Sequence, residues 1–442
     1  MGKAVNDLWD KIVDWFKNSS KDPCEDSYED TKSPSYAAYV ACGGFAVLIF
    51  VAYYLVAFVF CNDPGRQDMK AHALFAQEFY MRGDLFLKAW LRLPYMMWHL
   101  IVKTLESRCG FPLWDAASFT FASFGVFNFG ITTWFLKALI ERYTKKNAFM
   151  FSAVGSLLLS FVGPLSCWWV GDAYGTAMSP NPLHNPTHMA VKGFGLLVLM
   201  AGIDIIRRYR SEETVFFKKE KKLYLYFGIF LFLSTITKPT FMYMLLPAGF
   251  IIVLIDLVKG LVKKDGTADK IGGAIWKIAC ASIPSIVYLL VEYFAFYYWG
   301  DATNASSIII TKPLTVWHML AEDVPTAILL GMCFPLYMLI THPGYFFKSI
   351  EGRLALVCYA VGVAEFTLLA ESGARMDAAN FAWCMMSGMV VFYAVAVVRL
   401  ILTTLLSKRN KAHIANVMIG WFLLLLHVYS LFTYYHIFDD IL

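Results

Sequence analysis

Four short segments of this sequence hold the residue types that acid–base catalysis and phosphate binding require. The first places Asp63 in an Asn-Asp-Pro turn directly after a long apolar stretch, and Asp68 and His72 follow it. A carboxylate held at a membrane boundary is partly desolvated, a condition that suits it to accept a proton. Asp68 and His72 are spaced i, i+4, so both lie on one face of the helix that is predicted next. The alternative is a turn aspartate followed by ordinary polar residues of a helix surface.

The second segment, residues 171–188, has no lysine or arginine but contains Asp172, His184, His188 and three prolines. Histidines in such a segment serve as ligands, bases or hydrogen-bond donors to phosphate. Their i, i+4 spacing suits zinc on a helix, but the proline between them argues against a regular helix there. Since the cysteines show no zinc-binding spacing either, we predict no metal site. The alternative is a rigid loop in which asparagine and threonine cap the next helix.

The third and fourth segments add cations. Lys238 lies in a Thr-Lys-Pro-Thr sequence between two apolar stretches, where a charge is costly unless it snorkels to the surface or meets an anion. Arg375 is the only arginine in the short loops on its side of the membrane. A guanidinium binds phosphate through two parallel N–H···O hydrogen bonds. The alternative for Arg375 is an i, i+4 ion pair with Glu371 that braces the loop. Glu365, in the apolar stretch before it, is an intramembrane carboxylate and therefore a functional candidate.

Apolar helices must position these residues. The 442 residues are 58% hydrophobic and only 16% charged, whereas soluble domains contain about 25% charged residues. Apolar stretches near the length that a bilayer demands predict an all-α polytopic membrane protein with about 11 transmembrane helices. They run over 36–60, 114–137, 148–170, 189–206, 223–237, 240–259, 274–299, 325–341, 352–370, 381–404 and 413–436.

We expect one transmembrane domain over residues 36–442, preceded by a cytoplasmic amphipathic segment over 1–35. Lysine and arginine cluster at one set of helix ends, whereas the opposite short loops hold only Lys238, Lys312 and Arg375. The positive-inside rule then predicts a multi-pass protein of the cell membrane with a cytoplasmic N-terminus and an outer C-terminus. The outer loop over 61–113 is also basic, which we attribute to two amphipathic helices lying in the membrane interface.

All the candidate residues fall on the outer side, and their arrangement resembles the GT-C superfamily of membrane glycosyltransferases, of the bacterial cell-surface polysaccharide type. The matching segments are 62–83, 181–187, 237–240 and 371–375. The resemblance implies a large first outer loop of two interfacial helices with an aspartate base near its start. This sequence has a single aspartate in that turn instead of an acidic pair, so the base is either Asp63 or Asp68.

The resemblance further implies transfer of a sugar, with inversion, from a polyprenyl-phosphate carrier to a glycan, lipid or protein acceptor outside the membrane. No cofactor is assigned, a divalent metal ion is left open, and nucleic acid is not an expected partner. A polysaccharide polymerase or ligase and a lipid-linked sugar flippase or transporter are the alternatives, followed by a non-catalytic scaffold. The expected substrate-binding residues are His72, Asp172, His184, His188, Lys238, Glu371 and Arg375.

Overall fold

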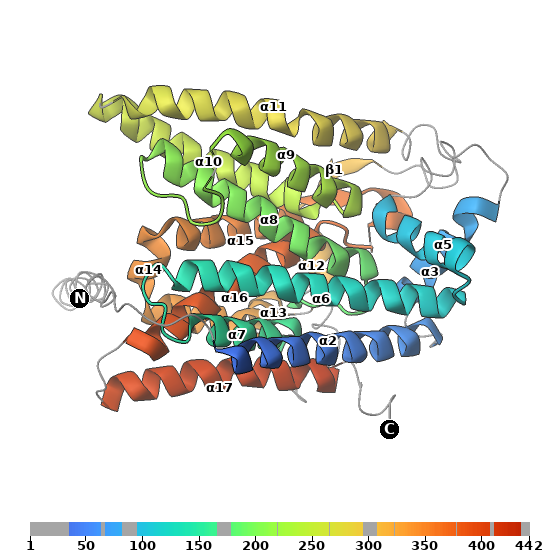
Figure 1. Cartoon of the computed structure of the whole chain (residues 1–442). Coiled ribbons are helices and arrows are strands. Elements are labelled where there is room, and N and C mark those ends of the chain that lie inside the picture. The colour runs from blue at the N-terminus through green and yellow to red at the C-terminus, as the bar shows by residue number, and fades with distance from the viewer. Residues whose placement is uncertain are drawn as a thin grey trace.

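The computed structural model shows a bundle of long helices that run side by side (Figure 1). It describes residues 35–62, 67–81, 95–165, 178–218, 220–264, 266–294, 307–321, 323–376, 378–406 and 411–434. Eight of the described helices are long and apolar enough to cross a membrane, which confirms an all-α membrane protein. These are α2 (Tyr36–Asn62), α6 (Leu113–Ile140), α8 (Pro186–Tyr209), α10 (Thr240–Lys263), α11 (Thr267–Phe294), α13 (Val324–Thr341), α16 (Ala382–Leu406) and α17 (Lys411–Tyr434).

Three further predicted spans also coincide with helices, α7 (Ala148–Ser160), α9 (Glu220–Thr237) and α15 (Ile350–Leu368). Helix α7 ends well before the predicted boundary at residue 170, because a Gly-Pro pair follows its last turn. Helix α15 contains two glutamates and an arginine, which lowers its apolar character. The number of eleven spans therefore stays a prediction.

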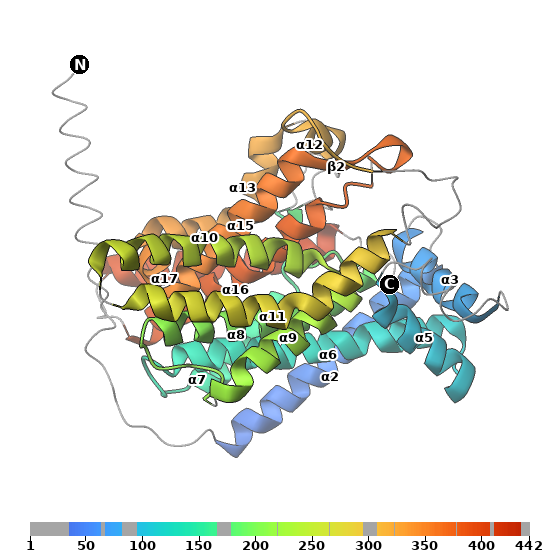
Figure 2. The ribbon, with the colours of Figure 1, turned by 90° about the horizontal axis from the view of Figure 1, so that it is seen from above.

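Short elements gather at one end of the bundle (Figures 1 and 2). Helices α3 (Gln67–Met81) and α5 (Met96–Cys109) occupy the part of the first loop where interfacial helices were predicted. Strands β1 (Ile308–Ile310) and β2 (Leu369–Glu371) pair antiparallel, and the 3₁₀ turn η5 (Gly373–Arg375) follows them. The remaining short helices are α12 (Thr315–Leu320), at this same end, and α14 (Pro343–Lys348), at the opposite end.

The core of the bundle is formed by helices that are buried on nearly every side. In the apolar window of α8, 89% of the residues are buried, against 22% in α11. Helix α8 is thus a central helix, whereas α11 presents most of its apolar surface outward, as a helix in contact with lipid does. Helices α15 and α16 approach closely at Gly362, which has no Cβ. A Cβ at this position would lie only 2.6 Å from the Cα of Met385.

The basic end of the bundle is held together by buried carboxylates. Asp204 of α8 accepts hydrogen bonds from the backbone N–H groups of Val215 at 2.7 Å, Phe216 at 2.9 Å and Phe217 at 2.6 Å. These bonds fold the segment after α8 back against the bundle, where Phe216 stacks on Phe135. Backbone donors buried in an apolar setting need such partners.

We predict that Asp204→Ala lowers the stability of the fold, because it leaves buried N–H groups without an acceptor, at a cost of about 2 kcal/mol or more. The melting temperature in detergent micelles should fall by several degrees. Glu213→Ala is the matched control, because Glu213 lies in the same segment but is exposed. Equal melting temperatures for the two variants would contradict the role of Asp204.

Candidate functional site

A cavity of about 500 Å³ opens at the end of the bundle opposite its lysine- and arginine-rich ends. It lies where α3, α10, α11 and α16 meet the strands β1 and β2. Five of the residues predicted from the sequence line it, namely Asp68, His72, Lys238, Glu371 and Arg375. Its other polar wall residues include Tyr95, Asn185, Glu292, Asn380 and Trp383. Two predicted residues, Asp63 and Asp172, lie outside the described part of the chain.

Lys238 is the buried cation of this cavity. It follows the last residue of α9 and precedes Pro239, the residue that caps α10, so the junction of two helices holds it in place. Its ammonium group donates hydrogen bonds to Asn185 Oδ1 at 3.1 Å and Thr187 Oγ1 at 3.3 Å, and lies 4.1 Å from the centre of the Trp383 ring. Burial lowers the pKa of Lys238 to about 7, although the carboxylate of Asp68 acts in the opposite direction. A lysine of this kind changes its charge readily when an anion arrives.

Asp68 is connected to this lysine through Asn185. The side-chain amide of Asn185 donates from Nδ2 to Asp68 Oδ2 at 3.1 Å, and its Oδ1 accepts the hydrogen bond of Lys238. His184 places its Nε2 3.8 Å from the same carboxylate oxygen. Nearly half of the Asp68 side chain, 47%, remains exposed, so a ligand in the cavity can reach the carboxylate.

His188 lies behind the wall of the cavity. Asn185 is the N-cap of α8 and accepts from the backbone N–H of His188 at 2.9 Å, so the alternative of a helix cap is confirmed. The His188 ring is fully buried 5.3 Å from the ring of Trp383, and neither of its nitrogens has a hydrogen-bond partner in the described structure. The sequence analysis assigned His184 and His188 to the same loop segment. In the structure, His184 precedes helix α8, whereas His188 lies in its first turn. Among the described residues, no group of three or more His, Cys, Asp or Glu side chains could hold a metal ion.

Arg375 and Glu371 form the opposite wall. Arg375 Nε lies 3.1 Å from Glu371 Oε2, and Asn380 also donates to this oxygen, so the bracing ion pair considered from the sequence is present. Strand β2 holds Glu371 by pairing it with Ile308, and Gly373 begins the turn with a φ of +69°, which favours glycine. Both charged side chains still line the cavity.

A pair of imidazoles supports the α3 wall, with His99 buried behind the partly exposed His72. His72 Nδ1 lies 2.9 Å from His99 Nε2, and His99 Nδ1 lies 3.0 Å from the carbonyl oxygen of Tyr95. Burial, the His99 ring and the charge of Lys238 hold the pKa of His72 well below its usual range. Burial lowers the pKa of His99 to about 4. Both rings are therefore neutral at physiological pH.

The sequence analysis missed several wall residues. Glu292, in the last turn of α11, accepts the backbone N–H of Tyr95 at 2.9 Å. Its signal was available, because it is a carboxylate inside a predicted span. His99 and Trp383 carry no such signal, since they occur in apolar surroundings typical of packed residues. Glu365, which was singled out for the same reason as Glu292, does not line this cavity.

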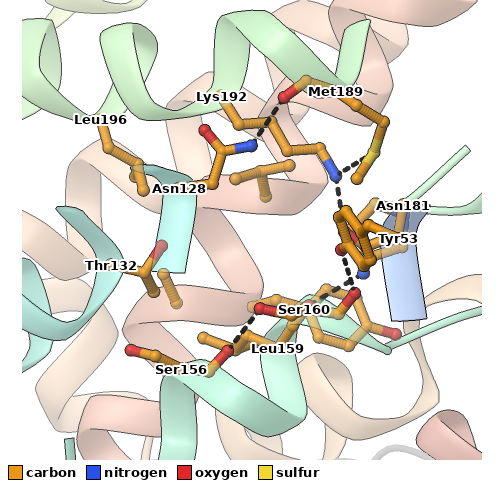
Figure 3. A pocket seen from close by; sticks show the side chains of 14 residues that line it. Tyr53, Asn128, Thr132, Ser156, Leu159, Ser160, Asn181, Met189, Lys192 and Leu196 are labelled. Atoms are coloured by element: carbon orange, nitrogen blue, oxygen red, sulfur yellow. Dashed lines mark hydrogen bonds between the residues drawn. The ribbon is translucent and has the colours of Figure 1, made fainter. Parts of the chain in front are cut away.

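A second, much smaller cavity of about 40 Å³ lies deeper in the bundle around Lys192 (Figure 3). Lys192 donates to Asn181 Oδ1 and to the sulfur of Met189. The amide of Asn181 donates in turn to the carbonyl oxygens of Leu159 at 2.8 Å and Val162 at 2.7 Å. Asn181 thus serves as the partner for carbonyl oxygens that have no helical hydrogen bond where α7 ends, and the cavity has room for only a few water molecules.

Neither of two comparisons with known proteins identifies a relative of this chain. A scan against protein-family models finds no match for the chain, and a search of curated proteins finds none either. The function of the large cavity must therefore be argued from the chemistry of its own residues.

Proposed function

We propose that the chain is a membrane glycosyltransferase of the GT-C type, which takes its sugar from a polyprenyl-phosphate carrier on the outer face of the membrane. The observation that carries the proposal is the pairing, in one cavity, of a buried lysine with an accessible carboxylate. The lysine suits the anionic phosphate of the carrier, and the carboxylate suits the hydroxyl that attacks the sugar. The apolar wall formed by Leu289, Tyr293 and Phe381 is compatible with a lipid-linked ligand.

In the proposed reaction, Asp68 takes the proton of the acceptor hydroxyl while its oxygen forms a bond to the anomeric carbon. The bond between that carbon and the carrier phosphate breaks, and its electrons leave with the phosphate. Lys238 and Arg375 stabilise the growing negative charge. One displacement of this kind inverts the anomeric centre, and the phosphate needs no proton to leave.

Of the two aspartates that the sequence offers, we assign the base to Asp68, because Asp63 lies outside the described residues. Asp68 lines the cavity, and a single amide, that of Asn185, connects it to Lys238. Glu371 is less suited, since Arg375 and Asn380 already occupy one of its oxygens. Glu292 is also committed, because it accepts the backbone N–H of Tyr95.

The alternatives make different demands on the bundle. A polymerase or ligase would use the same carrier on the same face, but it would rely on arginine and histidine and not on an aspartate of the first loop. A transporter would need a path for its solute near the middle of the membrane. The cavity at Lys192 is too small for a solute, at about 40 Å³, whereas the large cavity lies at one end. This contrast favours a transferase.

We predict that Asp68→Asn lowers sugar transfer at least about a hundredfold, the usual loss when a general base is removed. Transfer of radiolabelled sugar from a panel of polyprenyl-phosphate sugars by purified protein measures it. Asp63→Asn serves as the comparison, with retained transfer expected. Should Asp63→Asn abolish transfer while Asp68→Asn does not, the base is Asp63.

We predict that the affinity for the sugar donor falls as the pH rises above 7. Lys238 has a pKa of about 7, so its cation is present below that pH and is lost above it. The donor is a phosphodiester, and its own charge does not change in this range. Titrations of the protein with polyprenyl-phosphate sugar between pH 6 and 9 measure the affinity.

Lys238→Arg should make this affinity independent of pH, because a guanidinium stays charged throughout the range. Lys312→Gln is the control, since Lys312 is exposed and does not line the cavity. Equal pH profiles for the wild-type protein and Lys238→Arg would rule out Lys238 as the titrating group.

The proposed orientation predicts which ends of the bundle face outward. In a chain without its native cysteines, Lys312→Cys should react with an impermeant maleimide in intact cells. Lys146→Cys should react only after permeabilisation, because Lys146 is exposed at the basic end. Labelling in the reverse order would place the cavity on the cytoplasmic side.

A further inference from the structure

The contacts between the imidazoles of His72 and His99 determine which nitrogen of His72 carries a proton. The Tyr95 carbonyl oxygen can only accept a hydrogen bond, so His99 Nδ1, 3.0 Å away, must carry a hydrogen. His99 is neutral, and its Nε2 therefore has a lone pair and accepts. His72 Nδ1, 2.9 Å from that lone pair, must then be the donor. It follows that the remaining nitrogen of a neutral His72, Nε2, is unprotonated.

The surroundings keep this arrangement neutral and rigid. His72 faces His99 on α5, Lys238 between α9 and α10, and His184 before α8, and a second positive charge there would be repelled. Asp68, on the same face of α3, has its own partners in Asn185 and His184. The indole of Trp98 is fully buried and packs edge-on to both imidazoles, which limits their rotation.

Because Nδ1 is occupied by His99, a ligand in the cavity would meet His72 at Nε2. An unprotonated imidazole nitrogen can accept a hydrogen bond from a hydroxyl or an amide N–H. It cannot donate a hydrogen bond to a phosphate oxygen, which is itself an acceptor. The α3 wall therefore differs in chemistry from the cationic groups Lys238 and Arg375, which suit an anion.

We infer that His72 presents an unprotonated Nε2 to the cavity and there accepts a hydrogen bond from a carbohydrate hydroxyl, with His99 as the positioning residue. The carbohydrate rests on the proposed function, whereas the protonation pattern rests on the contacts of the two histidines with each other and with the Tyr95 carbonyl, and on the neutrality of both rings. The cavity is thereby divided into a phosphate-binding part and a hydroxyl-binding part.

Nitrogen NMR of the full-length protein in amine-oxide micelles, with ¹⁵N-labelled histidine rings, tests the protonation pattern. His72→Gln identifies the resonances of His72 by their loss. We expect a protonated Nδ1 and an unprotonated Nε2 throughout the range from pH 6 to 8. A proton on Nε2, or an imidazolium in that range, would overturn the inference.

His99→Phe removes the acceptor and should move the proton of His72 to Nε2 in a substantial fraction of molecules. His99→Gln keeps an amide oxygen as acceptor and should restore much of the wild-type pattern, and His318→Phe, at an exposed position, should leave it unchanged. A pattern in His99→Phe identical to that of the wild-type protein would show that His99 does not position His72.

Binding is tested by titrating octyl glucoside, octyl galactoside and octyl mannoside into the micelles. At least one of these should shift the His72 Nε2 resonance toward the hydrogen-bonded range, whereas the ring resonances of the exposed His318 should not respond. If no glycoside moves the resonance, the hydroxyl-binding role is wrong even where the protonation pattern is as expected.

Sugar transfer separates this inference from the proposed function. His99→Phe should lower kcat/KM about tenfold, the usual effect of a lost hydrogen bond to a substrate, with recovery in His99→Gln. If the protonation pattern is found but no transfer is detected, the proposed function fails alone. If transfer depends on Asp68 and Lys238 but His72 carries its proton on Nε2, the inference fails alone.

Discussion

The candidate site depends on the side-chain amide of Asn185. Its carbonyl oxygen accepts from the backbone N–H of His188 at 2.9 Å, the hydroxyl of Thr187 at 3.0 Å and the ammonium of Lys238 at 3.1 Å. Its amino group donates to Asp68 at 3.1 Å. One planar group thus starts helix α8, partners the buried lysine and holds the carboxylate of α3. The starting point of a central helix and the geometry of the cavity are therefore set by the same few atoms.

This amide also makes a buried lysine tolerable. An ammonium group taken out of water loses several kcal/mol of hydration, which Asn185, Thr187 and the face of Trp383 offset only in part. The part of the lost hydration free energy that these contacts do not replace disfavours the charged ammonium and lowers the pKa of Lys238. Under the proposed function, the phosphate of the carrier would supply the favourable interaction that the lysine lacks.

The bundle separates the parts of the molecule that provide stability from the part that provides chemistry. Helices α8 and α16 supply the apolar core, and the buried carboxylate Asp204 ties down the segment that follows α8 at the basic end. The cavity is built at the other end from helix termini, two short strands and the helices α3 and α5. Helix ends offer polar groups that the bundle itself does not use, and short elements can hold them without disturbing the core.

The sequence by itself determined the long helices and five of the polar residues that line the cavity. Apolar stretches of membrane-spanning length predicted each long helix, because the cost of unsatisfied backbone groups in lipid leaves few other structures. Polar residues at the ends of those stretches identified Asp68, His72, Lys238, Glu371 and Arg375, because polar groups at membrane depth are rare without a purpose.

Only the tertiary structure decided which polar residues meet. It placed His188 behind Trp383 instead of in the cavity and turned Asn181 toward the open carbonyls of α7. It also brought Glu292 to the wall of the cavity and His99 behind His72. These relations join segments far apart along the chain, and they depend on how helices rotate about their axes as they pack. A single sequence shows the length and period of each helix, but it does not contain the contacts between helices that set this rotation.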